Sequence, residues 1–148
     1  MRGFSSVILV AGLTAAAATP TARGSLIGLI KQQDAIEGCA WSAKAPEIGK
    51  GIFFLAEYDQ SDVLMNIRGA DVHLRRDPAS TRGALEKLGQ TLQEVYQAPG
   101  VRVEAVYTAT WLCGPKDTDC EVTKFKVVFR VHSGDNEQTV AGTGGVGC

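Results

Sequence analysis

Four cysteines constrain the fold of this 148-residue chain more than any other feature. They are Cys39, Cys113, Cys120 and Cys148, and an even set of cysteines in an exported protein is expected to pair into disulfides. Structural zinc sites usually take cysteines separated by about two to four residues, so the longer gap between Cys113 and Cys120 does not fit. A redox C-x-x-C motif is also absent. We therefore interpret all four cysteines as disulfide partners rather than as metal ligands or catalytic thiols.

The spacing of the cysteines favours one pairing over the alternatives. The stretch GPKDTD between Cys113 and Cys120 consists of turn-forming residues, and Gly114-Pro115 suits the start of a turn. A hairpin with this tip places its two cysteines opposite each other, near the ~5.5 Å Cα separation that disulfides prefer. Cys39 then pairs with Cys148 by elimination, which ties the start of the folded region to the C-terminus.

The N-terminal segment has the pattern of a secretory signal peptide. Arg2 precedes an uncharged run from residue 3 to residue 22, which contains the apolar stretch Val-Ile-Leu-Val and then many small residues. The strongly apolar part is much shorter than the roughly 20 residues of a membrane-spanning helix. We predict a signal peptide over residues 1–22, with cleavage after Ala17, Ala18 or Ala22, and a periplasmic or secreted mature chain without a transmembrane segment.

The length and composition of the remainder predict one β-rich domain over residues 23–148. Cleavage leaves roughly 125–130 residues, which is the length of a single domain. The chain is 45% hydrophobic, enough for a substantial core, and its net charge of −1 offers no general attraction for nucleic acid. Neither an internal repeat nor a low-complexity linker divides it.

Alternating apolar and polar residues predict antiparallel strands over much of the chain. In DVLMNIRGADVHLRR, a type II′ turn at Gly69-Ala70 places Met65 opposite Leu74 and Asn66 opposite His73. This register gathers the apolar side chains of both strands on one face, which are Val63, Met65, Ile67, Val72 and Leu74.

A second hairpin is predicted near the C-terminus. Phenylalanine and valine alternate with polar residues over 124–132, and a turn over 133–136 places His132 opposite Glu137 and Arg130 opposite Thr139. The segment VRVEAVYTATWLC, over residues 101–113, has the composition of a neighbouring strand, as does GIFFLAEYD over 51–59. If Cys113 faces Cys120 directly, either both faces of this ribbon are partly covered or a β-bulge shifts the register.

Two segments have ambiguous patterns. Residues 25–37 are compatible with a short helix, and residues 85–96 have leucines at helical spacing but also the strand-like alternation QTLQEVYQ. Weighing all segments, we predict a mainly β fold, a small antiparallel β sandwich or barrel with at most one or two short helices, stapled by disulfides.

Two motifs resemble ligand-binding loops but lack the required context. Residues 142–147 match G-x-G-x-x-G, which holds a pyrophosphate only when it opens a helix, and here only Cys148 follows. We interpret this stretch as a flexible tail that delivers Cys148 to its partner. Asp117, Asp119 and Glu121 alternate as in a calcium loop, but the glycine and the distant bidentate glutamate of an EF-hand are missing. We expect no metal and no cofactor.

The remaining candidates for function are cations and histidines. Lys124, Lys126, Arg130 and His132 lie in one phase of the predicted strand, with Lys116 near the hairpin tip. Such a row is either a solvated face that protects an edge strand or a docking surface for an acidic protein or envelope polymer. We predict a non-enzymatic binding or inhibitory protein that acts on a protein or envelope component. The alternative is a small secreted hydrolase that uses His73 or His132 as its base, although no G-x-S-x-G motif is present.

The predicted signal peptide has a direct test. Because Arg2 and the apolar run that follows it should direct export and then be removed, the protein recovered from the periplasm or medium should lack its first 17 to 22 residues. Intact-mass spectrometry measures this loss. A full-length chain that starts at Met1 and stays in the membrane fraction would contradict the prediction.

Overall fold

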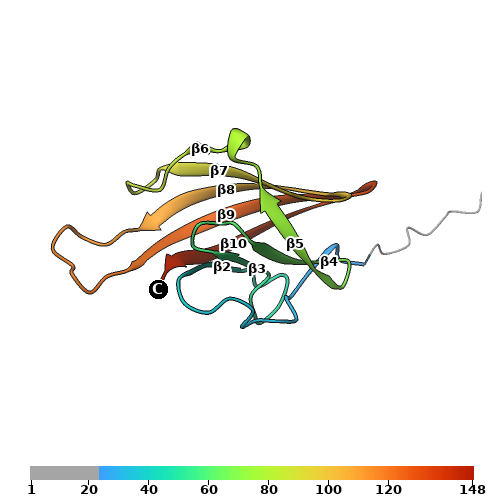
Figure 1. The fold of residues 1–148 in the computed structure, drawn as a ribbon, viewed down its shortest axis with the longest axis horizontal. Helices are drawn as coiled ribbons and strands as arrows, with labels where there is room; N and C mark the ends of the chain where they lie inside the picture. The colour runs from blue at the N-terminus through green and yellow to red at the C-terminus, as the bar shows by residue number, and fades with distance from the viewer. Residues whose placement is uncertain (1–23) are drawn as a thin grey trace, which may run out of the picture.

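The computed structural model describes residues 24–148 (Figure 1). The signal peptide predicted over residues 1–22 lies outside this range. The described part of the chain is mostly β, with 54% of its residues in strands, and its one helical element is a 3-10 turn, η1 (Pro78–Ser80). Its strands are β1 (Ile27–Gly28), β2 (Ala40–Lys44), β3 (Phe54–Glu57), β4 (Val63–Ile67), β5 (Ala70–Arg76), β6 (Arg82–Gly83), β7 (Thr91–Ala98), β8 (Val101–Trp111), β9 (Val122–Ser133) and β10 (Asn136–Gly147).

Eight of these strands form a closed antiparallel barrel. The ring runs β2-β3-β4-β5-β7-β8-β9-β10 and returns to β2, while β1 adds to β4 and β6 adds to β7. A short seam between β5 and β7 closes the ring, with Arg75 opposite Gln97 and Arg76 opposite Tyr96. The predicted mainly β fold is therefore confirmed, and of the two architectures proposed from the sequence the barrel is the one observed.

Aromatic side chains fill most of the interior. Phe129 lies 4.8 Å from Phe54 and 5.3 Å from Phe53 between ring centroids, and Tyr107 meets Phe125 edge to face at 5.0 Å. All five rings are fully buried. Burying one such side chain contributes roughly 1.5–3 kcal/mol, and aromatic pairs in these geometries add about 0.5–1.5 kcal/mol. These rings supply much of the apolar area that drives the barrel to close.

A β-bulge settles the register of β8 against β9. Tyr107 lies opposite Val127 and Ala109 opposite Phe125, but the next pair is Trp111 with Lys124, so one extra residue is inserted in β8. Before the bulge, the phenylalanines of β9 face the inward residues of β8; beyond it, the shifted register brings Cys113 beside Val122, with its sulfur 3.6 Å from the Val122 carbonyl, rather than directly opposite Cys120. The bulge proposed from the sequence is therefore confirmed.

The turn between β4 and β5 differs from the sequence prediction. The loop is Arg68-Gly69, not Gly69-Ala70, and both residues have positive φ (54° and 82°), as a type I′ turn requires. Arg68 is held there by tertiary contacts, since its guanidinium donates hydrogen bonds to the carbonyl and the hydroxyl of Ser133. Local turn preference could not reveal this partner, which lies 65 residues away in the sequence.

The corrected turn changes the facing pairs of this hairpin but not its inward face. Met65 lies opposite Val72, and Asn66 lies opposite Asp71 instead of His73. Because the register moved by two residues in total, the side-chain alternation is preserved. Four of the five predicted core residues (Val63, Met65, Ile67 and Leu74) are buried, and Val72 packs against them. In contrast, the C-terminal hairpin has the predicted register, with His132 opposite Glu137.

The glycine-rich C-terminus is a strand rather than the flexible tail that we predicted. Residues 136–147 pair with β9 along their whole length and with β2 near their end. Gly142 and Gly144 occupy inward positions, where an added Cβ would lie 3.1 Å from the Phe53 ring and 2.9 Å from the Phe125 ring. These glycines leave room for the aromatic core and for the close approach of β2, which explains the G-x-G-x-x-G pattern without a nucleotide.

Both ambiguous segments are resolved without a helix. Residues 91–98 form β7, and residues 25–37 contain β1 followed by turns. Ile30, from the segment 25–37, packs with Leu55 and Leu64, so this segment covers the outer face of β3 and β4. The Asp71 carboxylate fixes this cover by accepting hydrogen bonds from the amides of Lys31 and Gln32 at 2.9–3.1 Å.

Both disulfides have the predicted pairing. Cys113 and Cys120 are linked with a Cα separation of 5.5 Å, and Cys39 and Cys148 with a separation of 4.1 Å. The first closes the loop that extends from one end of the barrel in Figure 1, and the second joins the end of β10 to the residue before β2. The second link therefore reinforces the β2–β10 contact.

The two disulfides should contribute unequally to stability. The Cys113–Cys120 link spans 7 residues and the Cys39–Cys148 link spans 109. In the loop-entropy model they contribute about 2–3 and about 4–5 kcal/mol respectively. Cys148→Ser should therefore lower the melting temperature more than Cys113→Ser, measured by circular dichroism on chains whose remaining bridge is verified by peptide mapping. An equal or reversed order would show that the long link does not constrain the unfolded chain.

Asp71 should make stability depend on pH in the acid range. Burial alone would raise the pKa of Asp71, but hydrogen bonds from the Lys31 amide, the Asn66 side chain and the Gln32 amide outweigh burial and lower the pKa. A lowered pKa in the folded state means that the stabilisation is complete above pH ~4 and disappears as the pH falls through the folded-state value. Asp71→Asn should cost about 1 kcal/mol at pH 6 and almost nothing near pH 2, measured by urea unfolding. A pH-independent difference would contradict this account.

Candidate binding face and barrel mouth

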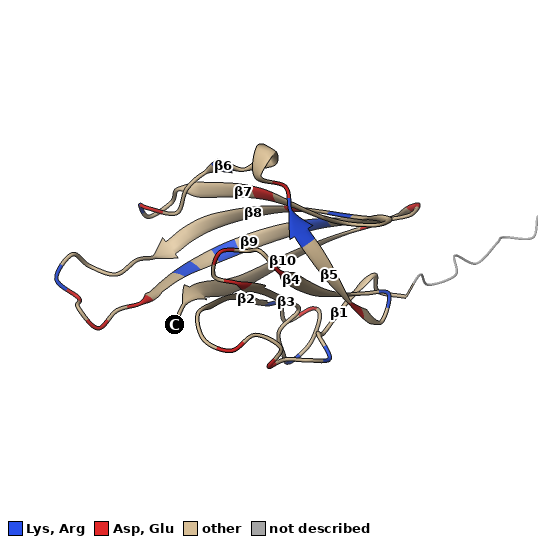
Figure 2. Ribbon diagram, viewed as in Figure 1, with Lys and Arg blue, Asp and Glu red and all other residues tan. Residues whose placement is uncertain are grey.

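The four predicted binding residues all lie on the outer face of β9. Lys124, Lys126 and Arg130 are exposed, His132 is half-buried, and Figure 2 shows the cations along this strand. However, β9 pairs with β8 on one side and with β10 on the other. The interpretation that this row of cations protects a sheet edge is therefore wrong, because β9 has no free edge.

The structure separates the four residues into two groups with different electrostatics. At one end of β9, the Glu137 carboxylate lies 3.2 Å from His132 Nδ1 and 3.8 Å from Arg130 Nε. Glu104 faces Arg130 from β8. Glu104 is itself paired with Arg102 at 3.1 Å, so two carboxylates offset the two arginines at this end of the face, which has little net field to attract an acidic partner.

Lys124 and Lys126 instead join Lys44 from β2 around a shallow groove of about 480 Å³. Gly144 and Gly145 are among its lining residues, and Gly145, at an outward position of β10, adds no side chain to fill it. None of the ion pairs found among residues 24–148 involves these three lysines. The groove therefore has a concentrated positive charge. Its third lysine, Lys44, could not be predicted from local patterns, because β2 pairs with β10 across about 100 residues of chain.

An apolar strip borders this lysine groove. Val106 and Val128 face each other across β8 and β9, and they are 39% and 46% exposed. Trp111 is 42% exposed, with the Lys124 ammonium 5.4 Å from its ring centroid. The Thr108–Lys126 pair lies between the two valines and the Trp111–Lys124 pair, so apolar and cationic groups alternate along this face. Single exposed apolar residues are common, but three of them on one face beside uncompensated lysines are typical of a binding surface.

The two histidines have carboxylate partners but not the surroundings of a general base. His73 Nδ1 lies 2.9 Å from Asp62, with side chains 67% and 44% exposed, and it faces Leu64 rather than the predicted Asn66. His132 borders a hollow of about 330 Å³ whose lining residues include no serine, threonine or cysteine. A hydrolase of the predicted kind requires a hydroxyl or thiol beside the histidine. The hollow beside His132 has no such group in its lining.

A buried carboxylate at one mouth of the barrel was not identified from the sequence. Glu94 is on β7 in phase with Leu92 and Tyr96, which points it into the barrel, and it is 2% exposed. Its carboxylate accepts a hydrogen bond from Thr81 Oγ1 at 2.6 Å and lies 3.6 Å from Arg76. The alternation in QTLQEVYQ could have predicted this burial, because it places Glu94 on the same side of the strand as the apolar residues.

The buried tyrosines extend this polar region inward. The Tyr96 hydroxyl donates to Gln60 Oε1 at 3.1 Å and lies 2.8 Å from the Tyr107 hydroxyl. Burial is the main cause that raises the pKa of both tyrosines, so both stay neutral at physiological pH. Gln60, which is 3% exposed, has a positive φ of 58°, a backbone conformation that non-glycine residues seldom adopt.

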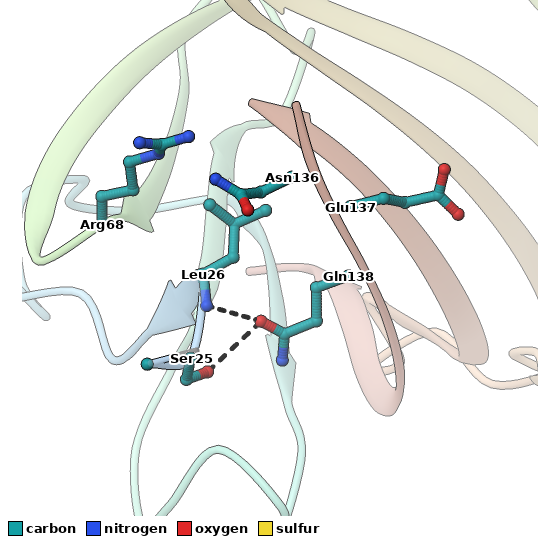
Figure 3. Close-up of a pocket in the computed structure, with 7 residues that line it drawn as sticks. Ser25, Leu26, Arg68, Asn136, Glu137 and Gln138 are labelled. Atoms are coloured by element: carbon teal, nitrogen blue, oxygen red, sulfur yellow. Dashed lines mark hydrogen bonds between the residues drawn. The ribbon is translucent and has the colours of Figure 1, made fainter. Parts of the chain in front are cut away.

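A hollow of about 690 Å³ lies at the start of the described chain. Figure 3 shows Gln138 directed at this segment, where its Oε1 accepts hydrogen bonds from the amide of Leu26 at 2.7 Å and from Ser25 Oγ at 3.3 Å. Arg68 also lines the hollow, but its guanidinium is bound to Ser133. The polar groups of this hollow thus bind neighbouring parts of the chain and have a structural role.

Neither a metal-ligand cluster nor a membrane-spanning helix is found among the described residues. Within residues 24–148, no three histidine, cysteine or acidic side chains converge as metal ligands. Asp117, part of the calcium-like pattern, accepts a hydrogen bond from the Gly114 amide at 2.9 Å and so stabilises its own turn. In the same range, the structure contains no helix of the length and apolarity needed to cross a membrane.

Comparison with protein-family models, with curated proteins and with solved structures finds no match to this chain. The chain is therefore defined by its own features, a small closed β barrel with two disulfides, which are consistent with an oxidising environment outside the cytoplasm.

Proposed function

We propose that this protein is an exported, non-enzymatic binding protein whose lysine groove and neighbouring apolar strip dock an acidic protein. The observation that carries the proposal is the juxtaposition of Lys44, Lys124 and Lys126 around one groove. Complementary charge across an interface steers association and selects partners, and its influence falls as salt is added.

The apolar strip favours a protein over an anionic polymer as the partner. Protein interfaces combine an apolar centre with a polar rim, and tryptophan is prominent among the residues that dominate binding energy. Val106, Val128 and Trp111 would supply the apolar contacts, and the lysines beside and between them would supply the polar ones. An acidic polysaccharide would pair with the lysines but would gain little from the valines.

The barrel supports this function because it holds the face rigid. β8, β9 and β10 each pair with neighbours on both sides, and their inward side chains form the aromatic core. A pre-organised face binds with a smaller loss of conformational entropy than a flexible one. The disulfides would preserve this geometry in the periplasm or medium.

The charge contribution is tested by capture from periplasmic or culture-medium extract across a salt series. The variant Lys44→Gln/Lys124→Gln/Lys126→Gln should lose most capture of acidic proteins at low salt, and the residual capture should depend less on salt. A matched control, Lys31→Gln/Lys50→Gln/Lys87→Gln, removes the same charge from exposed positions outside the groove. If both variants lost the same amount of capture, the effect would be due to net charge and not to the groove. If the groove variant captured acidic proteins as well as the unmodified protein, the proposal would be refuted.

A second variant distinguishes the kind of partner. Val106→Ser/Val128→Ser removes exposed apolar groups without changing charge, so stability should change little. Binding of a purified captured protein, measured by calorimetry, should weaken about tenfold, since each valine at an interface centre contributes on the order of 1 kcal/mol. Undiminished binding would refute the contribution of the two valines, and capture of acidic polysaccharide alone would exclude a protein partner.

A further inference from the structure

The barrel mouth beside Glu94 has a pocket that the proposed docking face does not use. Its volume is about 550 Å³, within the range of about 300–1,000 Å³ that is usual for small-molecule sites. The lining comes from β2, β5, β7, β9 and β10 and from the loops before β4 and β7. Eight-stranded barrels have interiors that side chains fill or that hold one small ligand near the mouth.

The pocket combines apolar walls with an excess of negative charge. Trp41, Leu92, Leu85 and Val146 are buried or half-buried hydrophobic residues in its lining. Among the lining residues, three carboxylates (Asp59, Glu86 and Glu94) face a single cation, the Arg76 guanidinium, and there is no lysine or histidine. Ions from solution screen the two rim carboxylates, but Glu94 is 2% exposed and is screened much less.

We propose that this pocket binds a small organic ammonium ion with an apolar body. The ammonium group would share the Glu94 carboxylate with Thr81 and Arg76, because a carboxylate accepts up to about four hydrogen bonds. The apolar body would lie against Leu85, Leu92 and the Trp41 indole, whose ring nitrogen donates to the Tyr58 carbonyl at 3.0 Å. This site is independent of the lysine groove, which opens on the outer surface of β9 and β10.

The probe for this site is 2-phenylethylammonium, titrated into the ¹⁵N-labelled mature protein and followed by NMR. Saturable shifts should map to the amides of the pocket lining, especially Thr81, Gly83 and Glu94. 2-Phenylethanol has the same apolar body without charge and should bind at least about tenfold more weakly, because charge-assisted hydrogen bonds are roughly twice as strong as neutral ones. The anion 3-phenylpropionate should bind more weakly still.

Glu94→Gln keeps the shape of the side chain and removes its charge, so it should weaken ammonium binding about tenfold and abolish the preference over the alcohol. The control Glu104→Gln removes a carboxylate from the exposed Arg102 pair on β8 and should leave binding unchanged. If Glu94→Gln fails to fold, Ala84→Trp, which fills the pocket from the loop after β6 with Glu94 intact, should block binding. The proposal would be overturned if the amine and the alcohol bound equally well, or if the shifts did not saturate or mapped to amides elsewhere. It would also be overturned if the folded Glu94→Gln or Ala84→Trp variant bound the amine as tightly as the unmodified protein.

Discussion

The short pairing between β5 and β7 closes the ring of strands, and the common interior depends on it. β5 pairs with β4 through its first half and reaches β7 only at Arg75 and Arg76. The adjoining chain reinforces this seam, since the Asp77 amide donates to the Val95 carbonyl at 2.8 Å and the Asp77 carboxylate caps the turn η1. Inside the seam, Arg76 meets the buried Glu94.

The seam also determines where polar groups enter the core. An aromatic interior does not solvate a charge. Nevertheless, Glu94, Gln60 and two tyrosine hydroxyls are buried at the mouth of the barrel near the seam. Burying these groups is tolerable only because they have hydrogen-bond partners, and no buried side-chain nitrogen or oxygen among residues 24–148 lacks one. The end of the barrel with this short seam thus also holds the buried Glu94 carboxylate and its polar neighbours.

Local patterns were sufficient to predict the fold class and the covalent framework. Alternation identified the inward faces of β4, β5 and β9, and the GPKDTD tip led to the Cys113–Cys120 pair and hence to Cys39–Cys148. The errors arose where distant contacts override local preference. Ser133 selects the turn at Arg68, and the Phe53 and Phe125 rings require the glycines of β10, so a pattern that suggested a tail is a strand.

The candidate sites were predictable only in part for the same reason. Lys124 and Lys126 share a face because of strand alternation, which the sequence shows directly. Their grouping with Lys44, and the contact of Glu137 with both Arg130 and His132, depend on which strands become neighbours. Closure of the barrel sets those neighbours, so the sites follow from the topology more than from any motif.

Native-state hydrogen exchange at the Asp77 amide tests the central claim of a closed barrel most directly. If the β5–β7 seam belongs to the same cooperative unit as β8 and β9, this amide should exchange only through global unfolding, with a protection factor close to those of the β8 and β9 amides. Exchange of the Asp77 amide near the unprotected rate, while β8 and β9 remain protected, would show an open sheet and contradict the barrel.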